Sequence, residues 1–216
     1  MTSTPGSAAP TATEYVHRFG RAERTAHWVV ASTFLVMTAT GLILYLPMFA
    51  ALAADRMLWK TLHVGAAIGF WAGLVAVVAA SPRRLRRTAS ELDRFDDDDR
   101  AWLAWAVRRR GPEPPAGRFN AGQKLNAAVI AGLAVVFTAS GALILLQESD
   151  AAFRGATSAI LVHDWATWVA VPLVAGHIYL ATLNAGTRHS LRGITLGTVR
   201  REWARKHHPK WEAECE

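Results

Sequence analysis

The chain has 216 residues, a formal charge of +7, 51% apolar residues and a single cysteine, Cys215. One thiol cannot form an intrachain disulfide, an iron–sulfur cluster or a zinc–thiolate site, so any metal chemistry must use histidine. The apolar residues gather in four long blocks and the charges lie between them. This distribution is typical of a membrane protein rather than of a soluble one.

The chain begins with a stretch rich in Ser, Thr, Ala, Pro and Gly that contains no apolar core. It is therefore not a secretory signal peptide, and we predict that residues 1–16 form a disordered N-terminal tail. We assign residues 17–206 to a four-helix membrane domain and residues 207–216 to a cytoplasmic C-terminal tail.

Four blocks each contain about 20 predominantly apolar residues, enough to cross a hydrocarbon core of ~30 Å as a helix. Backbone polar groups in lipid must be satisfied within the segment, so helices are expected. The predicted spans are approximately His27–Leu46, Leu58–Ala80, Leu125–Leu146 and Ser158–Leu183. In the loop 82–124 between the second and third spans, Ser90–Arg110 is amphipathic. It fits either a helix at the membrane interface or a solvated linker.

The basic residues predict the direction of the spans. Of the 24 Lys and Arg residues, all but Arg56, Lys60 and Arg154 lie before the first span, between the second and third, or after the fourth. By the positive-inside rule, both termini and the loop 82–124 are cytoplasmic. The fold class is therefore an all-α integral membrane protein, a four-transmembrane-helix bundle. Membrane topology and anionic lipid account for the basic charge without a nucleic-acid partner.

Four of the eight histidines lie within or at the edges of spans, where an ionisable side chain is costly and suggests function. His27 and His177 share the cytoplasmic depth, whereas His63 and His163 share the outer depth. His163 and His177 are 14 residues apart, which places them on one helix face and about 21 Å apart along the axis. The other four lie in polar flanks and are expected to be solvated or interfacial: His17, His189, His207 and His208.

Two imidazoles can fill both axial positions of a haem iron, and such an iron has no free site for oxygen or substrate. The pattern thus predicts electron transfer, with haem between His27 and His177 and between His63 and His163. The alternative is that each histidine only forms a hydrogen bond across helices. No nearby carboxylate or cysteine completes a tetrahedral metal shell. Arg18, Arg24 and Lys60 could offset haem propionates.

Six segments together have the pattern of a known family: Glu23–Trp28, Leu62–Gly65, Phe119–Lys124, Gly176–Tyr179, Leu191–Gly193 and Val199–Trp211. They resemble the cytochrome b (gamma) subunit of membrane-bound respiratory formate dehydrogenases. The resemblance covers about residues 17–214 and implies two b haems with the ligand pairs named above. The histidines alone fit a wider set that includes hydrogenase and thiosulfate reductase subunits. The sequence departs from the family after His163, where Asp164 and Trp165 are bulkier and more polar.

The resemblance further implies a menaquinone or ubiquinone site beside the inner haem. Its matching residues are Asn120, Ala121, Gly122, Gln123 and His177. Read without the resemblance, Asn120 caps the third helix and Gln123 occupies its first turn.

The implied partners are an iron–sulfur (beta) subunit and a catalytic (alpha) subunit, in the bacterial cytoplasmic (inner) membrane. Quinone reduction would occur in this chain, and formate oxidation in the catalytic partner. The alternatives are a cytochrome b subunit of a hydrogenase or related oxidoreductase, a haem-free membrane anchor and, with less support, a small transporter.

Overall fold

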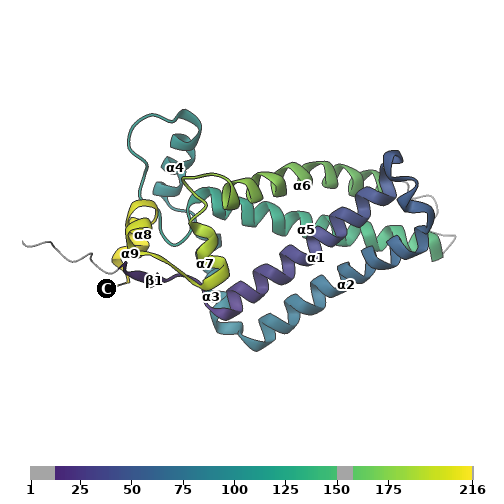
Figure 1. Cartoon of the computed structure of the whole chain (residues 1–216), viewed down its shortest axis with the longest axis horizontal. Helices are drawn as coiled ribbons and strands as arrows, with labels where there is room; N and C mark the ends of the chain where they lie inside the picture. Colours follow the sequence, from purple (N-terminus) through teal and green to yellow (C-terminus); the bar gives the residue numbers. More distant parts are fainter. Residues whose placement is uncertain (1–12, 150–157, 216) are drawn as a thin grey trace, which may run out of the picture.

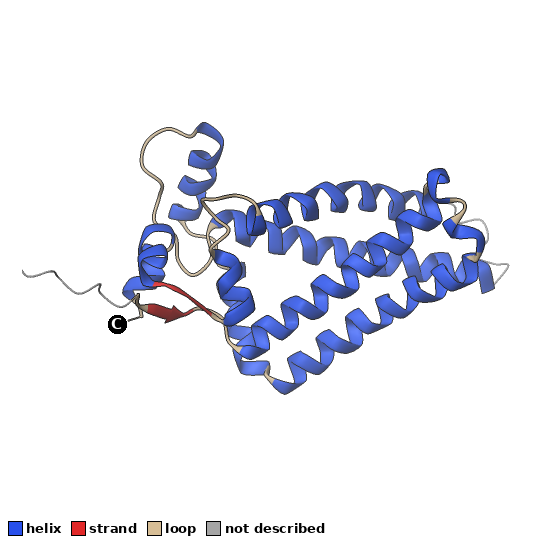
Figure 2. Cartoon of the chain, viewed as in Figure 1, coloured by secondary structure: helices blue, strands red, loops and turns tan. Residues whose placement is uncertain are grey.

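The computed structural model describes residues 13–149 and 158–215. In these residues, four helices are long and apolar enough to cross a membrane, which confirms the four predicted spans. They are α1 (Arg21–Tyr45), α2 (Arg56–Ala80), α5 (Ala121–Ser149) and α6 (Ser158–Thr182). The expectations for residues 1–12 and 150–157 lie outside the described part of the chain. Figures 1 and 2 show the four helices running side by side as an elongated bundle.

Local sequence sets the ends of these helices. Pro47 follows the end of α1 and begins η1 (Pro47–Phe49), a short 3₁₀ helix, and η2 (Leu52–Ala54) follows it. The Asp55 carboxylate caps α2 by accepting a hydrogen bond of 2.9 Å from the Leu58 backbone N–H. Pro82 occupies the first position of the next helix, α3 (Pro82–Asp93), where its missing N–H costs nothing. The 25-residue helix α6 contains Pro172 in its interior.

The long helices pack as two antiparallel hairpins, α1 with α2 and α5 with α6. Aromatic contacts join the hairpins: the rings of Phe34 on α1 and Phe137 on α5 lie 6.1 Å apart. The Trp71 indole N–H on α2 donates to the Thr138 hydroxyl on α5 over 3.0 Å. The outward faces carry exposed apolar side chains, such as Ile68 at 66% exposure. Exposed apolar faces on a four-helix bundle are what lipid contact requires.

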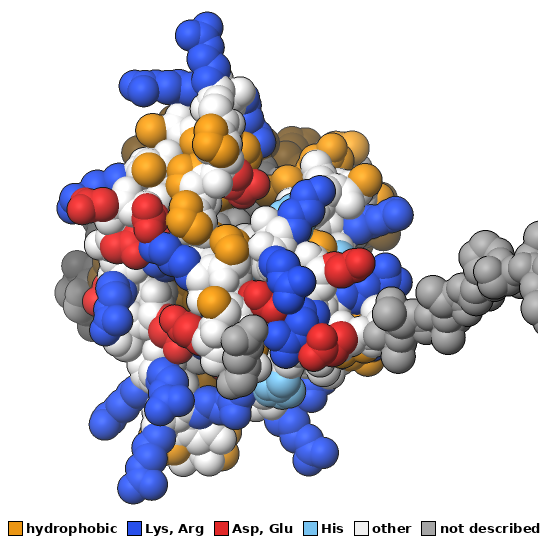
Figure 3. Space-filling model, turned by 90° about the vertical axis from the view of Figure 1, so that its left-hand side faces the viewer, with side chains coloured by type: hydrophobic (Ala, Val, Ile, Leu, Met, Phe, Trp, Pro, Cys, Tyr) orange, Lys and Arg blue, Asp and Glu red, His pale blue; other side chains and the backbone are white. Residues whose placement is uncertain are grey.

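The remaining elements gather at the end of the bundle where α1 and α5 begin, which we call the basic end; the opposite end is the distal end (Figure 1). They are β1 (Tyr15–His17), α3, α4 (Asp97–Arg108), α7 (Ser190–Leu196), β2 (Thr198–Arg200), α8 (Arg201–His207) and α9 (Pro209–Ala213). Figure 3 views this end and shows many Lys and Arg side chains around interspersed acidic ones. Whether the basic end faces the cytoplasm stays a prediction.

Two short strands far apart in the sequence, β1 and β2, pair in a small antiparallel sheet at the basic end. Val16 of β1 pairs with Val199 of β2, and both side chains are buried together with Trp211. The predicted boundary after residue 16 therefore differs from the structure, because Tyr15 and Val16 are part of the sheet. The predicted tail 207–216 does not separate from the fold in its described part, residues 207–215, since His208 is only 2% exposed.

The amphipathic stretch in the central loop contains a helix, α4, rather than an unstructured linker. Asp96 and Asp99 form a capping box at its start, with backbone-to-carboxylate bonds of 2.9 and 3.0 Å. The Lys124 ammonium donates to the Asp99 carboxylate over 2.6 Å and so attaches α4 to the first turn of α5. Whether α4 lies in a membrane interface stays a prediction.

Candidate functional site

The four intramembrane histidines lie in two pairs, and the pairing matches the depths predicted from the sequence. The ring centres of His27 on α1 and His177 on α6 are 6.2 Å apart, with an interplanar angle of 49°. The ring centres of His63 on α2 and His163 on α6 are also 6.2 Å apart, with an angle of 58°. The first pair lies toward the basic end and the second toward the distal end.

Each ring of the distal pair is held by a hydroxyl group from the preceding helix of its hairpin. His63 Nδ1 lies 3.0 Å from the Thr40 hydroxyl oxygen, and His163 Nδ1 lies 2.9 Å from the Ser140 hydroxyl oxygen. Each hydroxyl also donates over 2.7 Å to the backbone carbonyl four residues earlier. A hydroxyl that gives its one proton to that carbonyl accepts the hydrogen bond from the histidine. In this arrangement both rings carry their proton on Nδ1 and keep a lone pair on Nε2.

Both pairs fit a haem iron. A metal–imidazole bond of about 2 Å on each side, plus the distance from nitrogen to ring centre, puts two axial rings roughly 6 Å apart. Both observed separations are 6.2 Å. At the distal pair, the unprotonated Nε2 is the form that a metal requires. No group of three or more His, Cys, Asp or Glu side chains that could hold a bare metal ion occurs among the residues that the structure describes.

Thr40 and Ser140 are the functional candidates that the sequence reasoning missed. An internal repeat could have revealed them, because the segment Thr38–Gly41 (TATG) recurs one hundred positions later as Thr138–Gly141 (TASG). The hydroxyl and the histidine that it contacts are separated by 23 residues in both halves.

The segment predicted to contact quinone begins α5. The Gln123 backbone N–H donates to the Asn120 side-chain oxygen over 2.9 Å, and the Asn120 N–H donates to the Gln123 side-chain oxygen over 3.0 Å. The capping interpretation is thus present in the structure. It uses the two amide oxygens, and within the described residues the two amide NH₂ groups make no hydrogen bond. Ala121 is fully buried, and the Trp102 ring lies 3.1 Å from where a Cβ on Gly122 would stand.

A polar cavity of about 780 Å³ opens at the basic end next to this segment. Phe119 and Lys124, which flank Asn120–Gln123, both line it. Its walls also contain an ion-pair network in which Glu23, whose side chain is buried, accepts hydrogen bonds from Arg118 Nη1 and Arg84 Nε at 2.8 Å each. Water and protons can therefore approach the start of α5 from the basic end.

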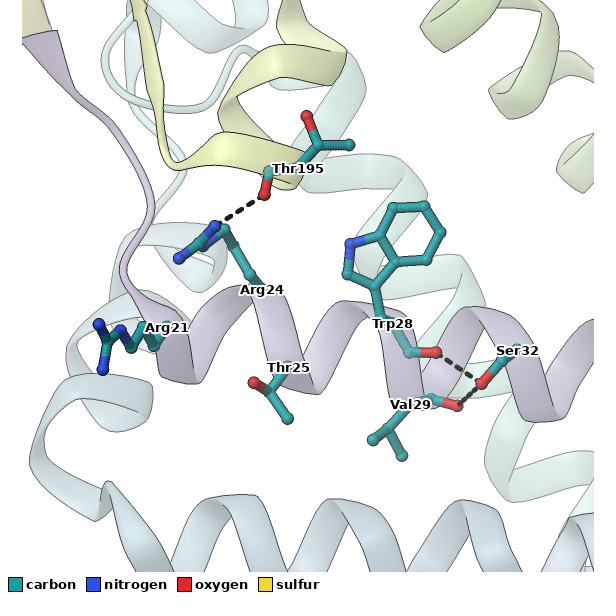
Figure 4. Close-up of a pocket in the computed structure, with 7 residues that line it drawn as sticks. All are labelled: Arg21, Arg24, Thr25, Trp28, Val29, Ser32 and Thr195. Atoms are coloured by element: carbon teal, nitrogen blue, oxygen red, sulfur yellow. Dashed lines mark hydrogen bonds between the residues drawn. The ribbon is translucent and has the colours of Figure 1, made fainter.

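A second, more open hollow of about 570 Å³ lies along α1 beside α7 (Figure 4). Arg24 donates to the Thr195 carbonyl over 2.7 Å, and the Trp28 indole N–H donates to the Ile194 carbonyl over 3.2 Å. These bonds attach α7 to the part of α1 that carries His27.

Arg18 is only 2% exposed and is enclosed by other protein groups, so the expectation that it offsets a haem propionate is wrong. Its guanidinium is buried at the basic end, where it donates to the Arg118 carbonyl over 2.8 Å and to His208 Nε2 over 2.9 Å. Burial, and next the Arg118 charge, lower the pKa of Arg18 to about 9. The expectation of a solvated His208 is also wrong: burial and then the Arg18 charge lower its pKa to about 3.

The bundle and its two facing histidine pairs define a membrane protein of the cytochrome b class. The family model of prokaryotic cytochrome b561 matches residues 18–197, and the chain belongs to this family. It is a multi-pass protein of the bacterial inner membrane.

Among curated proteins, the chain is similar to the cytochrome b556(Fdn) subunit of the nitrate-inducible formate dehydrogenase of Escherichia coli. The two are 26% identical over 200 residues, which cover 90% of this chain and 88% of that one. It is 27% identical to the E. coli formate dehydrogenase cytochrome b556(fdo) subunit, over 91% of this chain and 92% of that one. A formate dehydrogenase cytochrome b556 subunit of Haemophilus influenzae is 26% identical, over 88% of this chain and 79% of that one.

Proposed function

We propose that this protein is the membrane-anchoring di-haem cytochrome b subunit of a formate dehydrogenase complex, which passes electrons from an iron–sulfur subunit to membrane quinone. The observation that carries the proposal is the pair of facing imidazoles at each of two depths, with ring centres 6.2 Å apart in both cases. When bound, two b haems would supply one-electron transfer through the bundle.

The residues of the chain have distinct roles in this proposal. His27 and His177 hold the haem toward the basic end, and His63 and His163 hold the haem toward the distal end. The four ligands come from α1, α2 and α6, so the packing of the two hairpins sets the distance within each pair.

The quinone site is proposed at the start of α5. The free NH₂ groups of Asn120 and Gln123 can donate to a quinone carbonyl, while their oxygens hold the helix cap. Ala121, Gly122 and His177 complete the proposed site. The polar cavity that Phe119 and Lys124 line gives protons a path to this point from the basic end. With the basic end in the cytoplasm, quinone reduction would take up cytoplasmic protons.

The proposed partner subunits are inferred from the similarity of this sequence to its relatives. The relatives from E. coli and H. influenzae are named as formate dehydrogenase subunits, and each alignment covers most of this chain. We therefore propose an iron–sulfur subunit and a catalytic subunit of formate dehydrogenase as partners, with formate oxidised in the latter.

Haem content tests the ligand assignment directly. The purified protein is expected to show a reduced b-type spectrum and two haems per chain. His63→Ala or His163→Ala should each remove the same haem, and His27→Ala or His177→Ala the other. His17→Ala is the matched control, because His17 is an exposed histidine at the basic end and belongs to neither pair.

A folded protein without haem would refute the proposal and favour the haem-free anchor. Two haems remaining in His63→Ala would refute the ligand assignment. Copurification with the two partner subunits, followed by an assay of formate-dependent quinone reduction, tests the rest. A hydrogenase partner in their place would support the alternative oxidoreductase.

A further inference from the structure

The two halves of the chain repeat one another in structure as well as in sequence. At the start of each half, an arginine donates to the backbone carbonyl of its counterpart: Arg18 to Arg118 over 2.8 Å, and Arg118 to Arg18 over 3.3 Å. The next residues, Phe19 and Phe119, stack with ring centres 5.7 Å apart. Such reciprocal contacts arise when two similar units face each other across a twofold axis.

The distal histidine pair obeys this repeat, whereas the basic-end pair does not. His63 and His163 are counterparts, and so are the hydroxyls of Thr40 and Ser140 that hold them at 3.0 and 2.9 Å. The counterparts of His27 and His177 are Ala127 and Val77. Over residues 13–149 and 158–215, neither the His27 ring nor the His177 ring has a hydrogen-bonding partner. The two candidate haem sites therefore differ at Nδ1 of their histidines: a hydroxyl contacts Nδ1 at the distal pair, and no such contact occurs at the basic-end pair within the described residues.

This difference has a chemical consequence. A hydroxyl that accepts the Nδ1–H bond fixes the tautomer and the ring orientation, and it increases the electron density on the ring. A more basic imidazole stabilises the ferric form of an iron relative to the ferrous form. In the described part of the chain, His27 and His177 have no hydroxyl to accept such a hydrogen bond, so the reduction potential of their haem would not be lowered in this way.

We propose that Thr40 and Ser140 are positioning residues that orient His63 and His163 and lower the reduction potential of the distal haem relative to the haem at the basic end. The inference rests on the proposed function, because it requires haem between these histidines. The resulting order of potentials favours electron movement from the distal end toward the basic end, where the quinone site is proposed.

The test is a potentiometric titration of the two haems in the purified protein, followed by the reduced absorption band. Thr40→Val keeps the shape and removes the hydroxyl, and Ser140→Ala does the same on α5. Each variant is expected to raise the potential of one haem only. A hydrogen bond worth about 1 kcal/mol corresponds to roughly a fivefold shift toward the ferrous form. With additive effects, the double variant should reach about 25-fold, which is about 83 mV for one electron at about 59 mV per tenfold.

Two controls separate this role from a structural one. Thr33→Val removes a hydroxyl that bonds only to the backbone of α1, at 2.7 Å from the Val29 carbonyl, and should move neither potential. Thr40→Ser keeps the hydroxyl and should restore the original potential. If Thr40→Val loses the distal haem while Thr33→Val and Thr40→Ser keep it, the orienting role is supported.

Unchanged potentials in the double variant with both haems present would overturn the inference and leave the proposed function intact. An equal shift in Thr33→Val, or a shift of both haems, would also overturn it. Absence of haem from the unmodified protein would instead refute the proposed function.

Discussion

The buried carboxylate of Glu23 offers the sharpest test of what holds the basic end together. Glu23 is 7% exposed and accepts four hydrogen bonds: from the Gly20 backbone N–H at 2.6 Å and from Arg84, Arg118 and Thr88 at 2.8 Å each. These contacts join the start of α1 to α3 and to the segment before α5. Glu23→Gln keeps the shape of the side chain but removes its charge.

The free-energy cost of Glu23→Gln can be estimated from the solvent exposure of the two arginines that contact Glu23. The Arg118 side chain is 14% exposed, and loss of the Glu23 charge leaves it paired with Glu91, whose side chain is 38% exposed; breaking a buried ion pair typically costs about 3–5 kcal/mol, so we take about 3 kcal/mol, the lower end, as an upper value here. The Arg84 side chain is 49% exposed, and solvent screening reduces its contribution to a few tenths of a kcal/mol, roughly. A loss of about 3 kcal/mol corresponds to a roughly hundredfold increase in local opening.

Hydrogen–deuterium exchange of α3 and of residues 116–120 measures this opening. Glu91→Gln is the matched control, because Glu91 contacts the same Arg118 over 2.7 Å but its side chain is 38% exposed. We expect exchange in Glu23→Gln to increase far more than in Glu91→Gln. Equal effects from the two substitutions would show that burial of Glu23 does not determine the strength of the network.

Two further predictions concern the tail and the hairpin. Because the pKa of folded His208 is about 3 and its ordinary value is 6.5, the unfolded tail binds a proton at lower pH and the folded one does not. Docking of the tail should therefore weaken as the pH falls from about 6.5. His208→Asn should reduce this dependence in hydrogen–deuterium exchange corrected for intrinsic rates, and the remainder is expected from His207, whose pKa is also lowered by burial. Gly73→Ala should cost about 1–3 kcal/mol in thermal unfolding, because its Cβ would lie 2.6 Å from Val29 Cγ1. Val29→Ala should rescue it, and Gly65→Ala, with nothing within 4 Å, should have little effect.

The sequence by itself determined the membrane spans and the pairing of the four histidines within them. Hydropathy is a local property, and the fixed rise of a helix converts residue numbers into depth. For this reason His63 and His163 could be paired from the sequence alone, and their rings lie close together in the structure. The capping role of Asn120 and Gln123 could also be predicted from the sequence, because it is set within one turn of helix.

Only the tertiary structure decided what surrounds those residues. Thr40 on α1 meets His63 on α2, and Glu23 meets Arg118 across 95 positions of sequence. The tail appeared to be polar and solvated, yet His208 is buried against Arg18, 190 positions away. Such pairings depend on how the hairpins and the terminal sheet fold back on one another, and the burial that results changes the pKa of a side chain far more than its neighbours in sequence do.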